Sequence, residues 1–472
     1  MATRTLGDPS NNNDRVWPQA LTAILLCGSV VRFGLWLAFA EQPVQVADAQ
    51  DYNRLAVGLV EERAYLAASG KPSSLRPPLY PLVIAGLYEV FGLENYQAVR
   101  AFQGILSLAT VVIVYFMGRL AFDRDVGVLA AGVTCFYPSL LGFNNLLLSE
   151  TLFTFLLVLS TWLAMLAVAK QSWQLLAITG FCLGLGALTR SILWLYSPFL
   201  SIYFLGVWQG SRKQRFGAAV IPLATMLFVV APWAYRNTVI QDTLTIVDVM
   251  GGRNAMMGNY EYTPLERSWA TVSDVTGERS WDQVLRQKYP AAKGMTQGQL
   301  DKLAMRHGIQ FVLSHPILTA KRTVVRFFNY WQLERTMIAG MRQGLWGNFP
   351  GWFMIVVALL IVGSYVGTLF LGIVGLMMTR PKDRRFFWLF ILSIAFPCLI
   401  HSVIFAHSRY HLPTMPILFL FTASAATQWS SIWKRRDERA FRLAAVLCFV
   451  FVLGWARELV FVDLAQASKL LR

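Results

Sequence analysis

The sequence predicts an all-α polytopic membrane protein with about 11 transmembrane helices. Hydrophobic residues make up 56% of the 472 residues, charged residues only 14%, and the mean hydropathy is +0.48. A soluble domain carries about 25% charged residues, so this composition already favours the membrane. The apolar residues gather in runs of about 20, which is the length that a helix needs to cross a bilayer.

The chain begins with a polar, Asn-rich segment at residues 1–17, which we expect to be a cytoplasmic tail. The apolar run after it has no small-residue cleavage site, so it predicts an anchor helix and not a removed signal peptide. Residues 18–472 are expected to form one transmembrane domain. The expected spans cover residues 18–40, 98–118, 126–143, 151–169, 173–189, 192–208, 216–234, 351–379, 386–405, 413–430 and 440–457.

The segment Leu79 to Gly92 is apolar but only 14 residues long, too short to cross a bilayer unaided. If it does not span, one face of the protein carries fifteen Lys and Arg residues, in the loops at 119–125, 170–172, 209–215, 380–385 and 434–442. The short loops opposite then carry two, Arg190 and Arg409. Because basic loops stay in the cytoplasm, we expect this segment to lie in the interface and the N-terminus to be cytoplasmic. The net charge of +16 follows the same pattern and does not indicate nucleic-acid binding.

This topology brings together on the outer face the residues 41–97, 144–150, 189–191, 235–350 and 406–412. The first outer loop, 41–97, and the large outer loop between spans 7 and 8, 235–350, hold the only soluble mass. We therefore expect the chemistry there, at the extracytoplasmic face of the plasma (inner) membrane.

Acidic residues of the first outer loop are the first candidates for catalysis. Spacings of three and four residues place Asp48, Asp51 and Tyr52 on one side of a short amphipathic helix. Carboxylates at a membrane face are otherwise solvated charges. Arg76 precedes two prolines that fix an extended backbone, so its guanidinium is held at headgroup depth, where it suits a phosphate or a simple interfacial anchor.

Three further charged residues lie at the outer ends of expected spans. Glu150 opens a span with no charge near it in sequence, which favours a function, although a carboxylate also stabilises a helix N-terminus. Arg190 and Arg409 depart from the positive-inside trend, which weakens the alternative that they only snorkel to the headgroups. With Arg76 they form a plausible clamp for a phosphate leaving group.

Neither cysteine nor histidine shows the spacing of a structural metal site. The five cysteines lie inside apolar stretches, as small buried residues do. The five histidines have no zinc-like spacing with nearby Asp or Glu.

Seven segments in order resemble the bacterial branch of the protein O-mannosyltransferase and aminoarabinose (ArnT-like) transferase superfamily. They are Asp48-x-x-x-Tyr52, R-P-P-L-Y-P (Arg76 to Pro81), S-E-T-L-F (Ser149 to Phe153), G-L-G-A-L-T-R (Gly184 to Arg190), P-W-A-Y-R-N (Pro232 to Asn237), G-G-R-N-A-M-M-G-N (Gly251 to Asn259) and R-Y-H-L-P-T-M-P (Arg409 to Pro416). The match runs over roughly residues 18–430.

The resemblance implies a GT-C fold, with interfacial juxtamembrane helices in the first outer loop, and a glycosyltransferase that uses a polyprenyl-phosphate-linked sugar as donor. The acceptor would be a lipid such as lipid A, a glycan or a protein. The family's first-loop acid matches Asp48, its second-loop acid matches Glu150, and its phosphate-contacting basic residue matches Arg76. Many relatives have two adjacent acids where this chain has Ala49, which leaves Asp51 as a rival base.

The mechanism that the resemblance implies is a single inverting displacement at the anomeric carbon of the sugar. Asp48 would take the proton of the acceptor, Glu150 would orient the acceptor or Asp48, and the arginines would neutralise the departing phosphate. If the acceptor is itself a phosphate, no base is needed. The seven matching segments also supply Tyr52, Tyr80 and His411, which we expect to contact substrate. Some relatives bind a divalent metal ion and others do not, so a metal stays open.

Two other functions fit a polytopic protein. A lipid-linked-sugar flippase or other transporter would carry ionisable residues near the midplanes of its spans, whereas only Arg32 lies deep in one here. An O-antigen ligase-like enzyme would use a pyrophosphate-linked donor and would not be expected to carry the R-P-P-L-Y-P segment.

Overall fold

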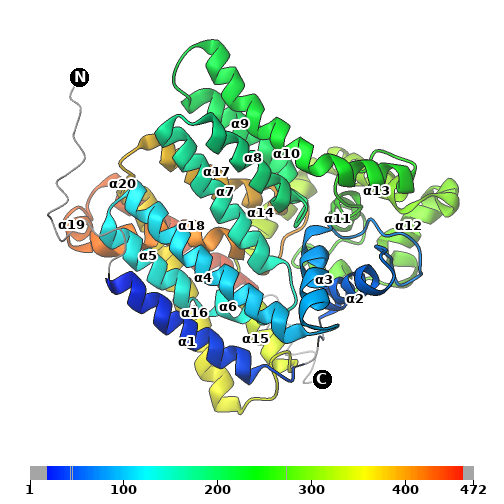
Figure 1. Cartoon of the computed structure of the whole chain (residues 1–472), viewed down its shortest axis with the longest axis horizontal. Helices are drawn as coiled ribbons and strands as arrows, with labels where there is room; N and C mark the ends of the chain where they lie inside the picture. The colour runs from blue at the N-terminus through cyan, green and yellow to red at the C-terminus, as the bar shows by residue number, and fades with distance from the viewer. Residues whose placement is uncertain (1–18, 43, 45, 273, 461–472) are drawn as a thin grey trace.

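The computed structural model describes residues 19–42, 44, 46–272 and 274–460, and within them the chain is helical and contains no strand (Figure 1). The tail expected at residues 1–17 lies outside the described residues. The all-α polytopic fold is confirmed. In the described part, seven helices are long and apolar enough to cross a membrane: α1 (Gln19–Ala38), α4 (Tyr96–Ala121), α7 (Glu150–Lys170), α10 (Arg212–Gln241), α16 (Gly351–Met378), α17 (Arg384–Val403) and α20 (Arg439–Glu458).

The other four expected spans are also helical but shorter or interrupted: α5 (Arg124–Phe136) followed by α6 (Pro138–Phe143), α8 (Trp173–Ala187), α9 (Ile192–Val207) and α18 (Met415–Thr427). The break between α5 and α6 falls at Tyr137, whose backbone is extended at φ −65° and ψ 118°. Pro138 causes it, because the residue before a proline is pushed out of the helical region. Hydropathy alone does not register this break.

The remaining helices belong to the loops between spans. The first outer loop forms α2 (Ala47–Glu61) and α3 (Leu79–Phe91). The large outer loop forms α11 (Gly251–Gly258), α12 (Trp281–Lys288), α13 (Gln297–Ser314), α14 (Pro316–Tyr330) and α15 (Arg335–Arg342), with 3-10 turns η2 (Ser268–Val272), η3 (Gly277–Arg279) and η4 (Pro290–Gly294). Two turns, η5 (Ser408–Tyr410) and η6 (Leu412–Thr414), precede α18, and α19 (Trp429–Lys434) follows it.

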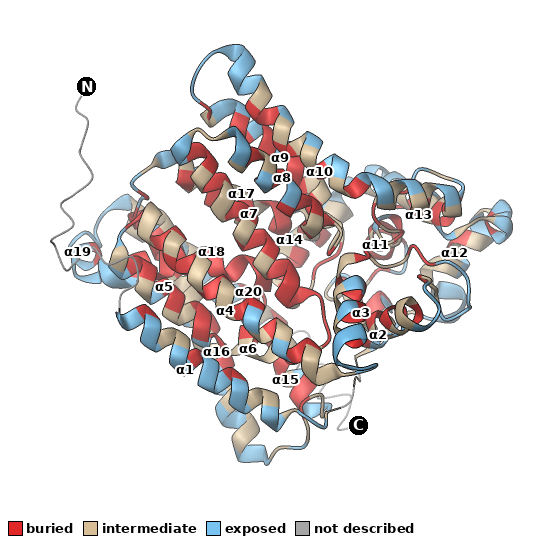
Figure 2. Cartoon of the chain, viewed as in Figure 1, coloured by how far each residue is buried: buried red, intermediate tan, exposed pale blue. Residues whose placement is uncertain are grey.

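Burial follows the position of each helix in the bundle (Figure 2). Helix α18 is buried along nearly its whole length, and in α7 67% of the apolar window is buried. Helices α1, α16 and α20 instead expose large apolar side chains such as Val30, Leu359 and Phe449. Such a broad apolar surface suits contact with lipid.

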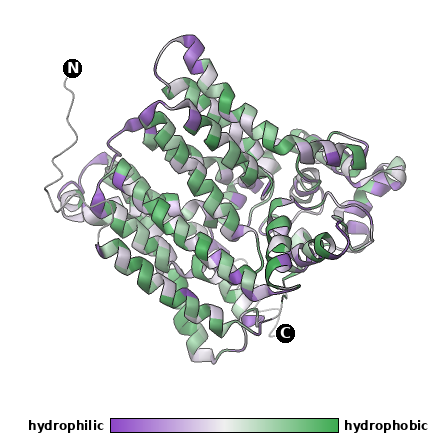
Figure 3. Cartoon of the chain, in the orientation of Figure 1, coloured by the Kyte–Doolittle hydropathy of each residue, from purple (hydrophilic) through white to green (hydrophobic). Residues whose placement is uncertain are grey.

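The basic loops lie at the ends of the spans remote from α2, α3 and α11, where Figure 3 shows hydrophilic residues gathered. Two backbone contacts join them in pairs: Lys382 donates its N–H to the carbonyl of Ala121 at 2.7 Å, and Gln209 donates to Gln171 Oε1 at 3.1 Å. At the opposite ends, the large outer loop has a small core of its own around Met256 and Leu285.

Candidate functional site

A cavity of about 570 Å³ opens where segments far apart in the sequence meet, at the end of the bundle that carries α2, α3 and α11. One wall is apolar and is formed by the ends of α7, α9 and α17, with Phe153, Leu157, Ile192, Pro397 and Phe405. The polar and aromatic lining includes Asp48, Asp51, Tyr52, Arg76, Arg190, Asp248, Arg253, Asn254, Trp269, His407 and Arg409. All three arginines that the sequence singled out therefore face one cavity.

Asp48 lies between two of these arginines. Arg76 Nη2 contacts its Oδ1 at 2.7 Å, and Arg409 Nη2 contacts its Oδ2 at 2.6 Å. Burial by itself would raise the pKa of Asp48, but the guanidinium groups of Arg409 and Arg76 outweigh it and hold the pKa well below its ordinary value. Asp48 is therefore a firmly ionised carboxylate whose two oxygens are both engaged.

Asp51 and Tyr52 complete the contacts of Arg76. Arg76 Nη2 also contacts Asp51 Oδ2 at 3.0 Å, and its guanidinium carbon lies 5.5 Å from the centre of the Tyr52 ring. The backbone is fixed as well, since the hydroxyl of Tyr65 donates to the carbonyls of Arg76 and Pro77 at 3.0 and 3.2 Å. The Nε of Arg76 is buried without a hydrogen-bond partner among the described residues.

Glu150 does not line the cavity. Its side chain is 1% exposed, and it lies behind two of the arginines, with Arg190 Nη2 at 2.5 Å and Arg409 Nε at 3.6 Å from Oε1. Arg190 Nε also donates to the hydroxyl oxygen of Ser149 at 3.1 Å. The Tyr52 hydroxyl lies 3.3 Å from the same Ser149 oxygen. In this arrangement Glu150 holds two arginines, one of which also contacts Asp48, and the expectation that it orients the acceptor or Asp48 stays a prediction.

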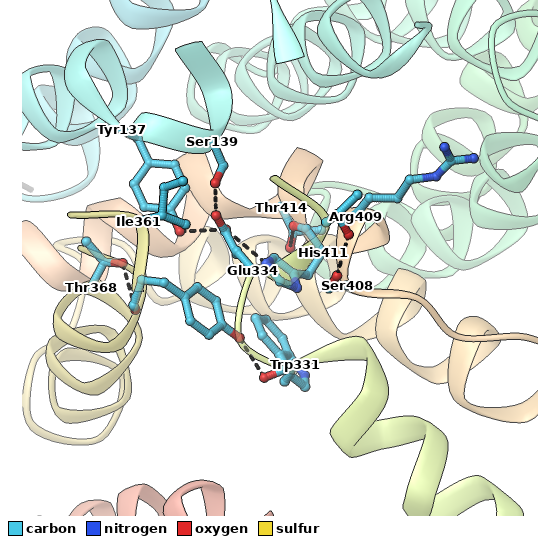
Figure 4. A network of polar contacts seen from close by, with 12 residues as sticks. Tyr137, Ser139, Trp331, Glu334, Ile361, Thr368, Ser408, Arg409, His411 and Thr414 are labelled. Atoms are coloured by element: carbon cyan, nitrogen blue, oxygen red, sulfur yellow. Dashed lines mark hydrogen bonds and ion pairs between the residues drawn. The ribbon is translucent and has the colours of Figure 1, made fainter. Parts of the chain in front are cut away.

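Tyr80 and His411, which we expected to contact substrate, do not reach the cavity. Tyr80 is 1% exposed and donates its hydroxyl to Gln103 Oε1 at 2.8 Å. His411 is equally buried, with Nδ1 2.6 Å from the carbonyl of Tyr330 and Nε2 3.1 Å from Glu334 Oε1. Figure 4 shows Arg409 pointing away from this Glu334 network although it leaves the same turn. Both residues therefore support the segments that carry site residues.

Sequence reasoning missed Asp248, Arg253 and Trp269, which form the wall contributed by the large outer loop. Arg253 Nε and Trp269 Nε1 are buried without a partner among the described residues. His407 packs edge-on against Trp269, with ring centres 5.4 Å apart, and burial lowers the pKa of His407 to about 3, so that it is neutral at physiological pH. Two signals were available: Asp248 is a single acid within the apolar run I-V-D-V-M, and Arg253 lies in the G-G-R-N-A-M-M-G-N segment.

The carboxylates of the cavity do not fit a divalent metal ion as they stand. The described residues contain no group of three His, Cys, Asp or Glu side chains that could hold one. Asp48 and Asp51 are bound by guanidinium groups, which a metal would have to displace.

Comparisons with known proteins bear on the family and the fold of this chain. The model of the dolichyl-phosphate-mannose-protein mannosyltransferase family matches residues 75–235. No curated protein matches the sequence. Among solved structures, the apo oligosaccharyltransferase of Archaeoglobus fulgidus has a TM-score of 0.51 at 13% identity, covering 94% of this chain and 55% of that chain. The same organism's AglB, in complex with an inhibitory peptide and a dolichol-phosphate, has a TM-score of 0.50 at 13% identity, covering 95% and 56%.

The ArnT of Cupriavidus metallidurans, bound to undecaprenyl phosphate, has a TM-score of 0.42 at 13% identity and covers 87% of this chain and 80% of that chain. A TM-score this low does not by itself establish a common fold. The chain spans just over half the length of the archaeal oligosaccharyltransferases that it matches. The archaeal structures show that the chain shares their fold, which is the GT-C fold expected from the sequence, and the family model matches residues 75–235 of it.

Proposed function

We propose that this chain is a membrane glycosyltransferase that moves a sugar from a polyprenyl-phosphate carrier to an acceptor lipid, glycan or protein. The observation that carries the proposal is the convergence of Arg76, Arg190 and Arg409 on one cavity at the ends of apolar helices. The matching family model, whose description names a dolichyl-phosphate-mannose donor, supports the same chemistry.

A phosphate is the ligand that the charged wall suits best. Guanidinium groups bind phosphate oxygens through paired, charge-assisted hydrogen bonds. The buried Nε atoms of Arg76 and Arg253 lack partners among the described residues, so they remain available to an oxygen-rich ligand. When the bond to the sugar breaks, negative charge develops on the phosphate, and fixed cations stabilise it there.

A polyprenyl chain is the carrier that the apolar wall suits best. Phe153, Ile192 and Phe405 line the cavity from the ends of α7, α9 and α17 or just beyond them. Their helices continue into the bundle, so an isoprenoid chain attached to the bound phosphate would pass directly into apolar surroundings.

The cavity belongs, in this proposal, to the extracytoplasmic face of the plasma (inner) membrane. The loops that hold fifteen Lys and Arg residues lie at the other ends of the spans, and such loops stay in the cytoplasm. The expected short, interfacial helix corresponds to α3 (Leu79–Phe91), whose first N–H donates to the carbonyl of Leu188 at 2.9 Å.

The transporter alternative gains no support from Arg32. Its guanidinium is buried in α1 and donates to the hydroxyl of Ser107 at 2.8 Å and to the carbonyls of Cys135 and Gly28 at 3.1 Å. An arginine whose donors are used by neighbouring helices joins those helices and leaves nothing for a transported ion.

Binding of farnesyl phosphate to the detergent-solubilised protein tests the proposal, with farnesol as the uncharged comparison. We expect farnesyl phosphate to bind and farnesol to bind at least tenfold more weakly, since charge-assisted hydrogen bonds contribute about 1.5–3 kcal/mol. Arg76→Ala should weaken phosphate binding and Arg76→Lys should retain part of it, while the exposed Arg306→Ala serves as control. Equal binding of both ligands would contradict the proposal.

A further inference from the structure

Asp248 is the cavity aspartate that makes no ion pair with any described residue. Asp48 and Asp51 are bound by arginines, whereas Asp248 accepts a hydrogen bond from the backbone N–H of Met250 at 3.1 Å and one from the side chain of Ser191. It lines the cavity from the large outer loop, as do Arg253 and Asn254.

The backbone on both sides of Asp248 is fixed by the P-W-A-Y-R-N segment and the first outer loop. Trp233 Nε1 and Asn237 Nδ2 both donate to the carbonyl of Val247 at 2.9 Å. The N–H of Val249 donates to the carbonyl of Ser74 at 3.1 Å, and the Ser74 hydroxyl donates back to Asn237 Oδ1 at 3.0 Å. These contacts fix the backbone at Asp248, and the hydrogen bond from the N–H of Met250 holds its carboxylate.

We propose that Asp248 is the carboxylate that accepts the proton of the acceptor hydroxyl, and that Asp48 serves to fix Arg76 and Arg409. This inference rests on the proposed function and revises the role expected for Asp48. A base needs an oxygen that can turn to the acceptor, and both oxygens of Asp48 are engaged by guanidinium groups. Among the described residues no guanidinium group pairs with Asp248, whose carboxylate accepts hydrogen bonds from Met250 and Ser191 and so keeps lone pairs that no cation holds.

The step balances as a single displacement. The acceptor oxygen forms a bond to the anomeric carbon while the bond from that carbon to the phosphate oxygen breaks, and its electron pair leaves with the polyprenyl phosphate. The proton of the acceptor hydroxyl passes to the carboxylate of Asp248 and from there to water. Neither oxidant nor reductant is required.

The electrostatic surroundings of Asp248 agree with this role. Burial raises its pKa to about 6, and Asp301 on α13 adds to the effect, whereas the hydrogen bonds from Ser191 and Met250 and the charge of Arg76 oppose it. Tyr65, whose hydroxyl donates to the carbonyls of Arg76 and Pro77, is near enough for the charge of Asp248 to act on it. A base whose pKa lies near the working pH combines an ionised form with a usable affinity for the proton.

The test compares pH–rate profiles of wild type, Asp248→Asn and the exposed loop control Asp242→Asn. The substrates are a panel of farnesyl-phosphate-linked sugars and a membrane extract that supplies acceptor hydroxyls, and the signal is release of farnesyl phosphate. In wild type and Asp242→Asn, kcat/KM should fall on the acid side with an apparent pKa near 6. Asp248→Asn should be slower by about 10²–10⁴-fold and should lose that acid limb.

Two further measurements, farnesyl phosphate binding and rescue by azide, distinguish loss of the base from loss of folding. Asp248→Asn should still bind farnesyl phosphate, which shows that it has folded, and azide, an acceptor with no proton to lose, should restore part of its turnover. A near wild-type rate, or an acid limb retained by Asp248→Asn, would overturn the assignment. Absence of turnover and of farnesyl phosphate binding in wild type would instead refute the proposed function itself.

Discussion

Replacing Glu150 by Gln distinguishes two roles for this residue, holding the arginines or contacting the substrate. The change keeps the shape of the side chain and removes its charge. Glu150 is 1% exposed, and its Oε1 lies 2.5 Å from Arg190 Nη2 and 3.6 Å from Arg409 Nε. The substitution therefore leaves two guanidinium groups in the interior with one anion fewer.

The loss of stability depends on which partners each arginine retains after the substitution. Removing one partner of a buried ion pair costs about 3–5 kcal/mol when nothing replaces it. Here Arg409 retains Asp48 at 2.6 Å, and Arg190 retains the Ser149 hydroxyl at 3.1 Å. We therefore expect a loss near the lower bound, about 3 kcal/mol of unfolding free energy.

Equilibrium unfolding in detergent at pH 7 measures this loss, with Glu89→Gln as the matched control. Glu89 is an exposed carboxylate paired with Arg63, and removing a surface pair should cost about 1 kcal/mol or less. In a double-mutant cycle, Glu150→Gln and Arg190→Gln together should cost about 2 kcal/mol less than the sum of the single changes. Unchanged stability with a large loss of kcat would refute this reasoning and return Glu150 to a direct role on substrate.

Three further outcomes are expected. Cysteines at Ser69 and Gln297 should react with a membrane-impermeant maleimide on intact cells, and one at Lys213 only after permeabilisation; the reverse pattern would invert the topology. Asp48→Asn frees two guanidinium groups, so farnesyl phosphate should bind more tightly, by up to about tenfold, while turnover falls; unchanged affinity would contradict the pairing. The pKa of Asp248, about 6, lies above its ordinary value, so its protonated form is stabilising in the fold and that contribution is lost as the pH rises through 6. Asp248→Asn should therefore raise the free energy of unfolding at pH 8 by up to about 3 kcal/mol and at pH 5 by only about half as much, because the carboxyl group of the folded protein is then mostly protonated; an equal shift at both would contradict the burial of the charge.

Much of the fold could be predicted because hydropathy and helix length are local properties of the chain. The long spans α4, α7 and α16 follow directly from apolar runs. The interruption at Tyr137 does not follow from the apolar run, because the backbone preference of a residue before proline sets it. Nor does the 13-residue length of α18, a helix that is buried on all sides.

The site was predictable where residues sit at the ends of spans, as Arg190 and Arg409 do, because topology alone brings those ends together. The contacts of Glu150 with the arginines could not be predicted, because they depend on the distances between α7 and two turns remote in the sequence. Asp248 was missed for a similar reason. Only the fold shows that Trp233 and Asn237 hold its backbone at the cavity.

Turnover of farnesyl-phosphate-linked sugars by arginine variants tests the central claim most directly. The measurement is kcat and KM for wild type, Arg76→Ala, Arg190→Ala, Arg409→Ala and the exposed control Arg306→Ala. Because charge on the phosphate develops in the transition state, each cavity variant should lose about 10²–10³-fold in kcat, whereas the control should match wild type. A kcat near wild type in all three cavity variants would contradict a phosphate leaving group at this cavity.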